Sequence, residues 1–265
     1  MAENILTVEN LNIAYQGVPA VMDVNFTLER GKVLTIVGES GSGKTTVIRA
    51  LMGLLPVGGE VTDGTMLFNG QDLRTLSKSE WRAIRGKDMA MIFQDSGSAL
   101  DPIVRIGKQF RELFKSHVEI TNDECDRRAI ELLESVSLPN GADILRRYPH
   151  ELSGGQRQRV GIAMALALDP ALLIGDEPTS ALDVTTQSQV VMQMLELAKE
   201  HNSAIVMVTH NLGVAAYMSD YIIVMKKGRV VDAGTPQDIL ENPSNEYTKQ
   251  LKDAVPTLGG GRYID

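Results

Sequence analysis

Residues 38–45 read Gly-Glu-Ser-Gly-Ser-Gly-Lys-Thr and match the pattern G-x-x-x-x-G-K-[S/T]. The apolar run Val33–Val37 precedes this stretch and predicts a buried strand, and Thr45–Leu55 has the apolar spacing of a helix. Glycines between such a strand and helix let successive backbone N–H groups point at phosphate oxygens, and the positive end of the helix adds to the attraction. The stretch therefore predicts a site for a nucleoside triphosphate.

The residues of this phosphate-binding loop have separate expected roles. Lys44 has the length and charge to reach the β- and γ-phosphates, and the hydroxyl of Thr45 is a ligand for Mg²⁺. An ordinary glycine-rich turn is the alternative, but such turns rarely carry Lys-Thr directly after the last glycine. The residues that we expect at the nucleotide are Gly38, Ser40, Gly41, Ser42, Gly43, Lys44, Thr45 and Thr46.

A second chemical signal lies downstream, where residues 171–177 read Ala-Leu-Leu-Ile-Gly-Asp-Glu. This is an apolar strand that ends in two carboxylates, and open α/β sheets bind ligands at the carboxyl ends of their parallel strands. Asp176 is then placed to hold Mg²⁺, and Glu177 to polarise an attacking water. A solvated acidic turn is the alternative interpretation, and it is less favoured because the phosphate-binding loop occurs in the same chain.

Length, charge and cysteine content limit what the protein can be. The 265 residues suffice for one large α/β domain or two small ones. The net charge of −8 argues against a protein that wraps nucleic acid, and the single Cys125 cannot form an intramolecular disulfide. The N-terminus has no signal-peptide pattern, and the longest run without a polar residue, Val160–Leu168, is too short to cross a bilayer. These features predict a soluble protein of the cytoplasm.

The order of the remaining patterns indicates an α/β fold. Short alternating segments at Ile5–Val8 and Asn25–Leu28 open the chain, with a turn at Gln16-Gly17 between them. Further strands are expected at 61–69, 89–93, 171–174 and 204–208, and as a hairpin over 221–232. Strands that alternate with helices imply a mostly parallel core sheet, and the opening strands are expected to be antiparallel.

The middle of the chain has a different pattern. Between Ser96 and Leu152 the β-branched runs thin out, and apolar residues recur at three- and four-residue intervals in Ile106–His117 and Asp123–Ser137. We therefore expect a helical insertion into the α/β core. The segment ends in Leu152-Ser153-Gly154-Gly155-Gln156, and a helix is expected over Arg157–Leu168. Ser-Gly-Gly at the start of a helix is typical of a cap and of a second anion site.

With this segment the chain resembles the nucleotide-binding subunit of an ATP-binding-cassette (ABC) transporter, over about Leu6 to Pro256. Leu152–Gln156 matches the signature motif of that family. The resemblance implies the P-loop NTPase fold of an ABC cassette, ATP and Mg²⁺ as cofactors, and ATP hydrolysis as the reaction. It also implies that two cassettes pair head to tail, so that Ser153, Gly154, Gly155 and Gln156 of one close over the ATP held by the other.

The resemblance gives further residues a role. Tyr15 matches the aromatic residue that stacks on adenine, although aromatic residues are also common on surface strands. Gln94 matches a glutamine that senses Mg²⁺ and the attacking water, and His210 matches a histidine that contacts the γ-phosphate. Ser180–Asp183 matches a loop that crosses the dimer interface. The expected catalytic residues are Glu177, His210 and Gln94, and the expected Mg²⁺ ligands are Thr45, Gln94 and Asp176.

The resemblance also implies an organisation in four segments. Residues 1–95 form the first part of the ATPase core, and residues 96–157 form a helical subdomain that ends in the signature motif. Residues 158–235 form the second part of the core. Residues 236–265 form a C-terminal helix and, beyond Asp253, a flexible tail that contains Gly259-Gly260-Gly261.

Several stretches resemble the oligopeptide, dipeptide and nickel importer branch of the family. They include Met91–Asp95, Tyr148–Leu152, and Asn242-Pro243 ahead of Glu246-Tyr247-Thr248. The resemblance implies a subunit at the cytoplasmic face of the membrane that powers import of peptides, nickel or a metal chelate. The implied partners are two membrane permease subunits, a second ATPase subunit (a non-identical paralogue or a copy of this chain) and, indirectly, an extracellular substrate-binding protein.

The main alternative is a soluble ATPase of the same fold that serves DNA repair, translation or cofactor assembly. Such relatives usually fuse two cassettes or insert coiled coils or zinc sites, and the sequence shows neither feature. The charge of −8 also disfavours a nucleic-acid partner. A non-catalytic cassette would be expected to lack Glu177, His210 or the segment at Ser153, and a small-molecule kinase would leave Leu152–Gln156 unexplained.

Overall fold

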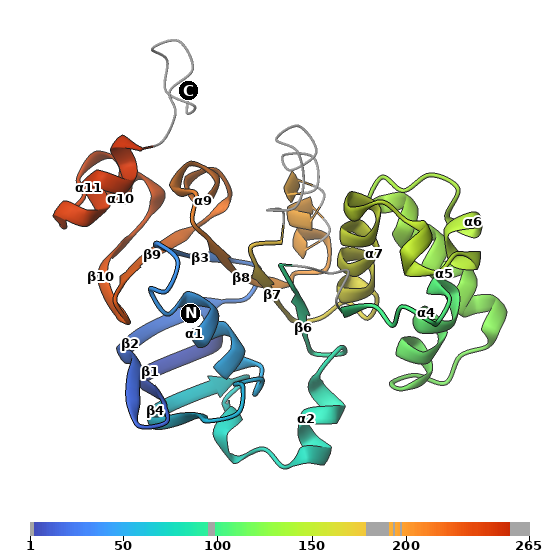
Figure 1. Ribbon diagram of the computed structural model, residues 1–265, viewed down its shortest axis with the longest axis horizontal. Helices are drawn as coiled ribbons and strands as arrows, with labels where there is room; N and C mark the ends of the chain where they lie inside the picture. The colour runs from blue at the N-terminus through green and yellow to red at the C-terminus, as the bar shows by residue number, and fades with distance from the viewer. Residues whose placement is uncertain (1–2, 95–98, 179–190, 193, 197, 255–265) are drawn as a thin grey trace, which may run out of the picture. The chain divides into compact units, whose positions relative to one another are not determined.

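The computed structural model describes residues 3–94, 99–178, 191–192, 194–196 and 198–254 (Figure 1). The chain forms two compact units: the first combines residues 1–76 with residues 204–265, and the second comprises residues 77–203. The four-segment organisation stays a prediction. No helix in the described part of the chain is long and apolar enough to cross a membrane.

The first unit opens with an antiparallel sheet. Its strands are β1 (Asn4–Tyr15), β2 (Val18–Glu29), β4 (Gly59–Phe68) and β5 (Gln71–Asp72), in the order β2-β1-β4-β5. Both Gln16 and Gly17 have positive φ, which a two-residue hairpin turn requires because its twist then matches that of the strands. The predicted turn and the antiparallel pairing are confirmed.

The predicted lengths of the first two strands are wrong, since each strand has twelve residues. Bulges explain the difference: Asn10 in β1 and Asp23 in β2 have φ of 51° and 52°, and the pairing shifts there. The Asn10 N–H donates to the side-chain oxygen Oδ1 of Asn25 in β2 at 2.7 Å. A bulge adds one residue, so the alternation of apolar residues changes phase and each strand reads as a short one.

The second sheet of this unit contains the strand that leads to the phosphate-binding loop. Its strands in this unit are β3 (Val33–Val37), β8 (Ala204–Thr209), β9 (Tyr221–Lys226) and β10 (Arg229–Gly234). They lie in the order β10-β9-β3-β8. β3 is parallel to both β8 and β9, and all five of its residues are buried. Burial on two faces explains why the strand reads as an uninterrupted apolar run. The mostly parallel core sheet is confirmed.

Helix α1 (Lys44–Leu51) follows the loop and ends four residues earlier than the predicted Leu55. Gly53 has φ of 60°, a conformation that ends helices, and the Leu54 N–H donates back to Arg49 O at 2.8 Å. The predicted end at Gly58-Gly59 is therefore wrong. Leu54 and Leu55 continue the apolar spacing although they lie beyond the end of the helix, and Leu54 has 37% of its surface exposed. The spacing alone therefore overestimates the length of the helix.

The described part of the first unit contains three further helices and a short 3₁₀ turn at Leu73–Thr75. α9 (Leu212–Met218) packs on β3 and β8, and α10 (Pro236–Glu241) and α11 (Glu246–Asp253) pack on α9 and β10 (Figure 1). The tail that we expect to be flexible lies, from residue 255 on, outside the described residues.

A buried carboxylate attaches the start of α11 to β10. Asp232 is 9% exposed; its Oδ2 accepts the N–H groups of Ser244 and Asn245 at 3.0 and 3.2 Å, and its Oδ1 accepts the Ser244 hydroxyl at 2.7 Å. Burial acts to raise the pKa of Asp232, but the hydrogen bonds from Ser244 and Asn245 outweigh it, so the net pKa is lowered. The charged form is therefore the stabilising one.

We expect Asp232→Asn to lower the free energy of unfolding by about 1–3 kcal/mol at pH 7, because charge-assisted hydrogen bonds are lost. A carboxyl whose pKa is lower in the folded state stabilises the fold above its unfolded pKa of about 4, and this contribution disappears as pH falls through the folded pKa. The difference between variant and wild type should thus shrink between pH 5 and pH 3 in urea titrations. Asp253→Asn, which removes an exposed carboxylate at the end of α11, is the control, and a difference that grows in acid contradicts the assignment.

The second unit contains a parallel strand pair and a helical bundle. β6 (Met89–Ile92) and β7 (Leu172–Asp176) are parallel. The bundle consists of α4 (Ile106–Lys115), α5 (Asn122–Ser135), α6 (Gly141–Arg146) and α7 (Gly154–Leu166), with a 3₁₀ turn at Pro149–Glu151 (Figure 1). The two long helices predicted in this segment are confirmed to within two residues at each end. The helical insertion of the predicted fold class is confirmed.

Helix α2 (Lys78–Ile84) was not predicted. It has no buried residue, so it lacks the apolar face by which helices are recognised in a sequence. Its signal is the capping box at its start, where the Ser77 hydroxyl accepts the Glu80 N–H and the Glu80 carboxylate accepts the Ser77 N–H. The described residues between 191 and 200 also lie in a helix, before β8.

Candidate functional site

The phosphate-binding loop is built around a buried ammonium group. Lys44 is 5% exposed and begins α1. Its Nζ donates to Gly38 O at 2.7 Å and to Glu39 O at 2.8 Å, and lies 3.4 Å from Ser42 Oγ. Carbonyl oxygens of the loop therefore surround the charge, and the lysine fixes the loop from inside. The backbone of residues 38–43 is thereby folded over the first turn of the helix.

Two glycines of the loop are required by space and by backbone conformation. A Cβ on Gly38 would lie 2.2 Å from Met225 O, so β9 leaves no room for a side chain there. Gly43 has φ of 102°, a conformation that side chains disfavour, and it precedes α1 directly. Glycine at these two positions therefore permits the curled backbone that the sequence pattern predicts.

The phosphate-binding loop is also held by the turn of the predicted β9–β10 hairpin, whose contact with the loop was not predicted from the sequence. The Gly228 N–H donates to Ser42 O at 2.9 Å, and Gly228 O accepts the Met22 N–H at 2.8 Å. Gly228 has φ of 79°, and a Cβ on it would lie 2.5 Å from Ala20 O. The sequence signal for this contact is the glycine in Lys227-Gly228, within the hairpin predicted over 221–232.

Tyr15 and His210 are the other expected site residues in the first unit. Tyr15 is half-buried at the end of β1, opposite Val18 and Gly59, and a Cβ on Gly59 would lie 2.6 Å from the Tyr15 ring. His210 is exposed and comes directly after β8. The chain turns sharply there, because Asn211 caps α9 by accepting the Val214 N–H at 3.1 Å.

The acidic pair lies in the second unit, at the end of β7. Asp176 is the last residue of the strand and is 5% exposed, so this carboxylate is buried at the carboxyl end of a parallel strand. Glu177 follows with φ of 45°, and it is half-buried. A glutamate in the left-handed conformation costs about 1–2 kcal/mol, and such residues gather at functional sites. The strand therefore ends in an abrupt backbone turn at Glu177.

The signature segment forms a capped helix start. The Ser153 hydroxyl accepts the Gln156 N–H at 3.2 Å, and Gln156 Oε1 accepts the Ser153 N–H at 2.9 Å. Helix α7 consequently begins at Gly154, and the predicted start at Arg157 is wrong. Both glycines lie within the first turn, where their poor helix propensity hid the helix from the sequence pattern.

A residue that the sequence analysis missed connects this helix to both strand ends. The side chain of Gln158 is 2% exposed, and its Nε2 donates to Phe93 O at 3.3 Å and to Pro178 O. Phe93 directly precedes Gln94, which is exposed two residues beyond β6, and Pro178 directly follows Glu177. The sequence signal for this role is the position of Gln158 four residues before the apolar Ile162, a spacing that places both side chains on the buried face of the helix. Gln158 therefore fixes the backbone beside two expected catalytic residues.

The structure distributes the expected residues over the two units. The first unit contains Tyr15, the loop from Gly38 to Thr46 and His210. The second unit contains Gln94, Asp176, Glu177 and the segment Ser153–Gln156. Ser180–Asp183, expected at a dimer interface, lies outside the described residues.

The chain is similar in sequence to known proteins over most of its length. The profile described as "ABC transporter" matches residues 21–180. The dipeptide transport ATP-binding protein DppD of Lactococcus lactis subsp. cremoris is 46% identical over 261 residues, which is 97% of this chain and 75% of that protein. The oligopeptide transport ATP-binding protein OppD of Bacillus subtilis is 44% identical over 259 residues, or 96% of this chain and 72% of that protein.

A solved structure extends the comparison to three dimensions. The ATP-binding cassette MJ0796, determined as a dimer in a post-hydrolysis state with ADP and Pi, has a TM-score of 0.78 and 29% sequence identity. The match covers 87% of this chain and 98% of that chain.

The chain therefore belongs to the ABC transporter family. Its fold is the α/β ABC cassette, it binds ATP, and it is an ATPase. The resemblance to the oligopeptide and dipeptide branch is confirmed by the relatives that it matches.

We expect Gln158→Leu to lower the free energy of unfolding by about 2 kcal/mol, because two backbone carbonyls lose their hydrogen-bond donor while the side-chain volume is kept. Urea or thermal unfolding measures the effect. Gln237→Leu, an exposed glutamine on α10, is the matched control and should change stability by less than about 0.5 kcal/mol. Equal stabilities of the two variants would contradict the structural role of Gln158.

Proposed function

We propose that this chain is the ATPase subunit of a membrane importer for small peptides, bound at the cytoplasmic face of the membrane. The observation that carries the proposal is the 46% identity to a dipeptide transport ATP-binding protein over 97% of the chain. The expected partners are two membrane permease subunits and a second ATPase subunit, with an extracellular substrate-binding protein that acts through the permeases. Nickel and metal chelates are the other cargoes of the importer branch that this chain resembles. The names of the matched relatives favour peptides as the cargo.

In this proposal the loop holds the triphosphate of ATP. The backbone N–H groups of residues 40–46 bind phosphate oxygens, and Lys44 gives its charge to the β- and γ-phosphates. Lys44 is preorganised for this role because Nζ already lies inside the loop, 2.7 Å from Gly38 O. The ring of Tyr15, supported by Gly59, offers a flat surface for adenine.

The donor set also fits Mg²⁺, which prefers hydroxyl and carboxylate oxygens. Thr45 in the first turn of α1 and the buried carboxylate of Asp176 are the ligands that we assign, with Gln94 as a further oxygen ligand. When bound, the ion would neutralise part of the negative charge of the phosphates.

Hydrolysis is assigned to three side chains. Glu177 accepts the proton of the attacking water, Gln94 orients that water, and His210 donates a hydrogen bond to the γ-phosphate. The left-handed backbone at Glu177 supports this assignment, because the structure retains a strained glutamate directly after the strand that ends in Asp176. Ser153, Gly154, Gly155 and Gln156 are assigned to the ATP of the paired cassette, where the capped start of α7 presents backbone N–H groups to an anion.

We expect Glu177→Gln to retain ATP binding while turnover falls by at least about 100-fold, because an amide cannot accept the proton of water. Phosphate release and nucleotide titration measure the two properties separately. Glu134→Gln, an exposed carboxylate on α5, is the control with wild-type turnover. Near-normal turnover of Glu177→Gln would remove the residue from the role of base.

The transport assignment is tested by ATP turnover of the chain alone and with the membrane proteins that co-purify with it. An importer subunit should hydrolyse ATP faster when its permeases and a peptide-loaded binding protein are present, because ATP binding is linked to assembly. Addition of di- and tripeptides, nickel or a metal chelate then identifies the cargo. Full activity without any recovered membrane partner would favour the alternative of an ABC-type ATPase that is not coupled to transport.

A further inference from the structure

The C-terminal helix makes a hydrogen bond to the phosphate-binding loop that none of the assigned roles explains. The backbone N–H of Glu39 donates to the hydroxyl oxygen of Tyr247 in α11, with 2.9 Å between N and Oη. The two residues are 208 positions apart in the sequence, and both belong to the first unit. The chain end is thus connected to the backbone that surrounds Lys44.

The bonded N–H belongs to the peptide group that joins Gly38 to Glu39. The carbonyl of the same group is Gly38 O, which accepts the hydrogen bond from Lys44 Nζ at 2.7 Å. In a trans peptide the N–H and the C=O point in opposite directions, so Tyr247 and Lys44 hold one peptide plane from its two sides. Hydrogen bonds in such a chain strengthen each other, and the charge of Lys44 adds to the effect.

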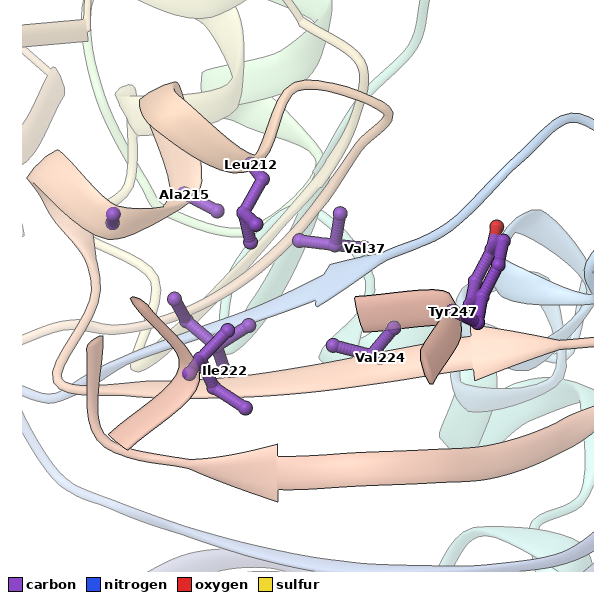
Figure 2. Close-up of a cluster of buried hydrophobic side chains, with 8 residues drawn as sticks. Val37, Leu212, Ala215, Ile222, Val224 and Tyr247 are labelled. Atoms are coloured by element: carbon purple, nitrogen blue, oxygen red, sulfur yellow. The ribbon is translucent and has the colours of Figure 1, made fainter. Parts of the chain in front are cut away.

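The hydroxyl of Tyr247 is itself held in a fixed place. The side chain is 3% exposed and belongs to a buried cluster with Val37, Leu212, Val224 and Ile239, of which Val37 directly precedes the loop (Figure 2). The Lys226 ammonium lies 4.3 Å from the centre of the Tyr247 ring. Burial raises the pKa of Tyr247, so the phenol keeps its proton at neutral pH. At the start of α11, Asp232 binds Ser244 and the backbone of Asn245.

We propose that Tyr247 is a positioning residue for the nucleotide: its hydroxyl holds the Gly38–Glu39 peptide, and with it the carbonyl partner of Lys44, in the orientation that receives phosphate. Glycine permits more backbone conformations than any other residue, so Gly38 by itself does not fix this orientation. A rotated peptide would withdraw Gly38 O from Lys44 and change the placement of the ammonium. The inference rests on the proposed role of the loop at the phosphates, and it adds that α11 sets the affinity for nucleotide.

The test is Tyr247→Phe in the full chain, with ADP and Mg²⁺ as the probe, because ADP is not hydrolysed. Phenylalanine keeps the ring in the cluster and removes only the acceptor of the Glu39 N–H. Calorimetric titration should show a dissociation constant raised by about three- to tenfold, the effect of one hydrogen bond. In ATPase assays KM should rise while kcat at saturating ATP is kept, because Tyr247 is assigned no contact with the reacting atoms.

Amide hydrogen exchange gives a readout that a loss of packing would not produce. In Tyr247→Phe the Glu39 amide should exchange faster, whereas the amides of Ile222 and Val224 in the same cluster should keep their wild-type protection. Tyr221→Phe removes a hydroxyl from a tyrosine on β9 that is 41% exposed, and it should change neither affinity nor exchange. An equal rise in exchange at all three amides would assign Tyr247 to packing and overturn the proposal.

Lys44→Ala separates this inference from the function on which it rests. Loss of ADP binding in Lys44→Ala, together with the intermediate loss in Tyr247→Phe, supports both. Loss of binding in Lys44→Ala with a wild-type dissociation constant in Tyr247→Phe overturns the positioning role alone. Unchanged ADP binding in Lys44→Ala would show that the loop is not the phosphate site, and both assignments would then fail.

Discussion

The ammonium group of Lys44 is the constraint around which the phosphate-binding loop is organised. A buried cation is costly unless polar groups surround it, and here the carbonyl oxygens of Gly38 and Glu39 do so at 2.7 and 2.8 Å. Those carbonyls can turn toward Nζ only because the backbone curls, and the curl requires glycine where β9 comes close and where α1 begins. The same placement that satisfies the charge leaves it ready for an anion. Stability of the loop and affinity for phosphate therefore have one physical origin.

Sequence patterns predicted those parts of the site that depend on neighbours along the chain. The strand Val33–Val37 was predicted to the residue, because burial on both faces leaves an uninterrupted apolar run. The patterns failed where one residue changes the backbone: Gly53 ends α1 early, and the bulges at Asn10 and Asp23 reset the alternation of the first two strands. They also failed at Gln158, whose bonds to Phe93 and Pro178 depend on tertiary packing.

The lysine assigned to the phosphates and the glutamate assigned as the base belong to different units of the chain. Lys44 and the loop lie in the first unit, and Asp176 and Glu177 lie in the second. The structural reasons for their placement differ as well. The loop is held by a buried charge and by glycines, whereas Glu177 is held in a left-handed backbone conformation after a buried strand. Because these supports are independent, a change in one is expected to leave the other in place.

In both units, backbone groups just beyond the ends of parallel strands form hydrogen bonds with side chains. Backbone groups beyond the last ladder pair lose their partners on the neighbouring strand, and buried N–H and C=O groups need others. Tyr247 supplies an acceptor after β3, and Gln158 supplies a donor to the carbonyls of Phe93 after β6 and Pro178 after β7. Each of these side chains comes from a helix remote in sequence. Polar side chains from packed helices thus fix loops that have no regular secondary structure, which lets a ligand site be both irregular and rigid.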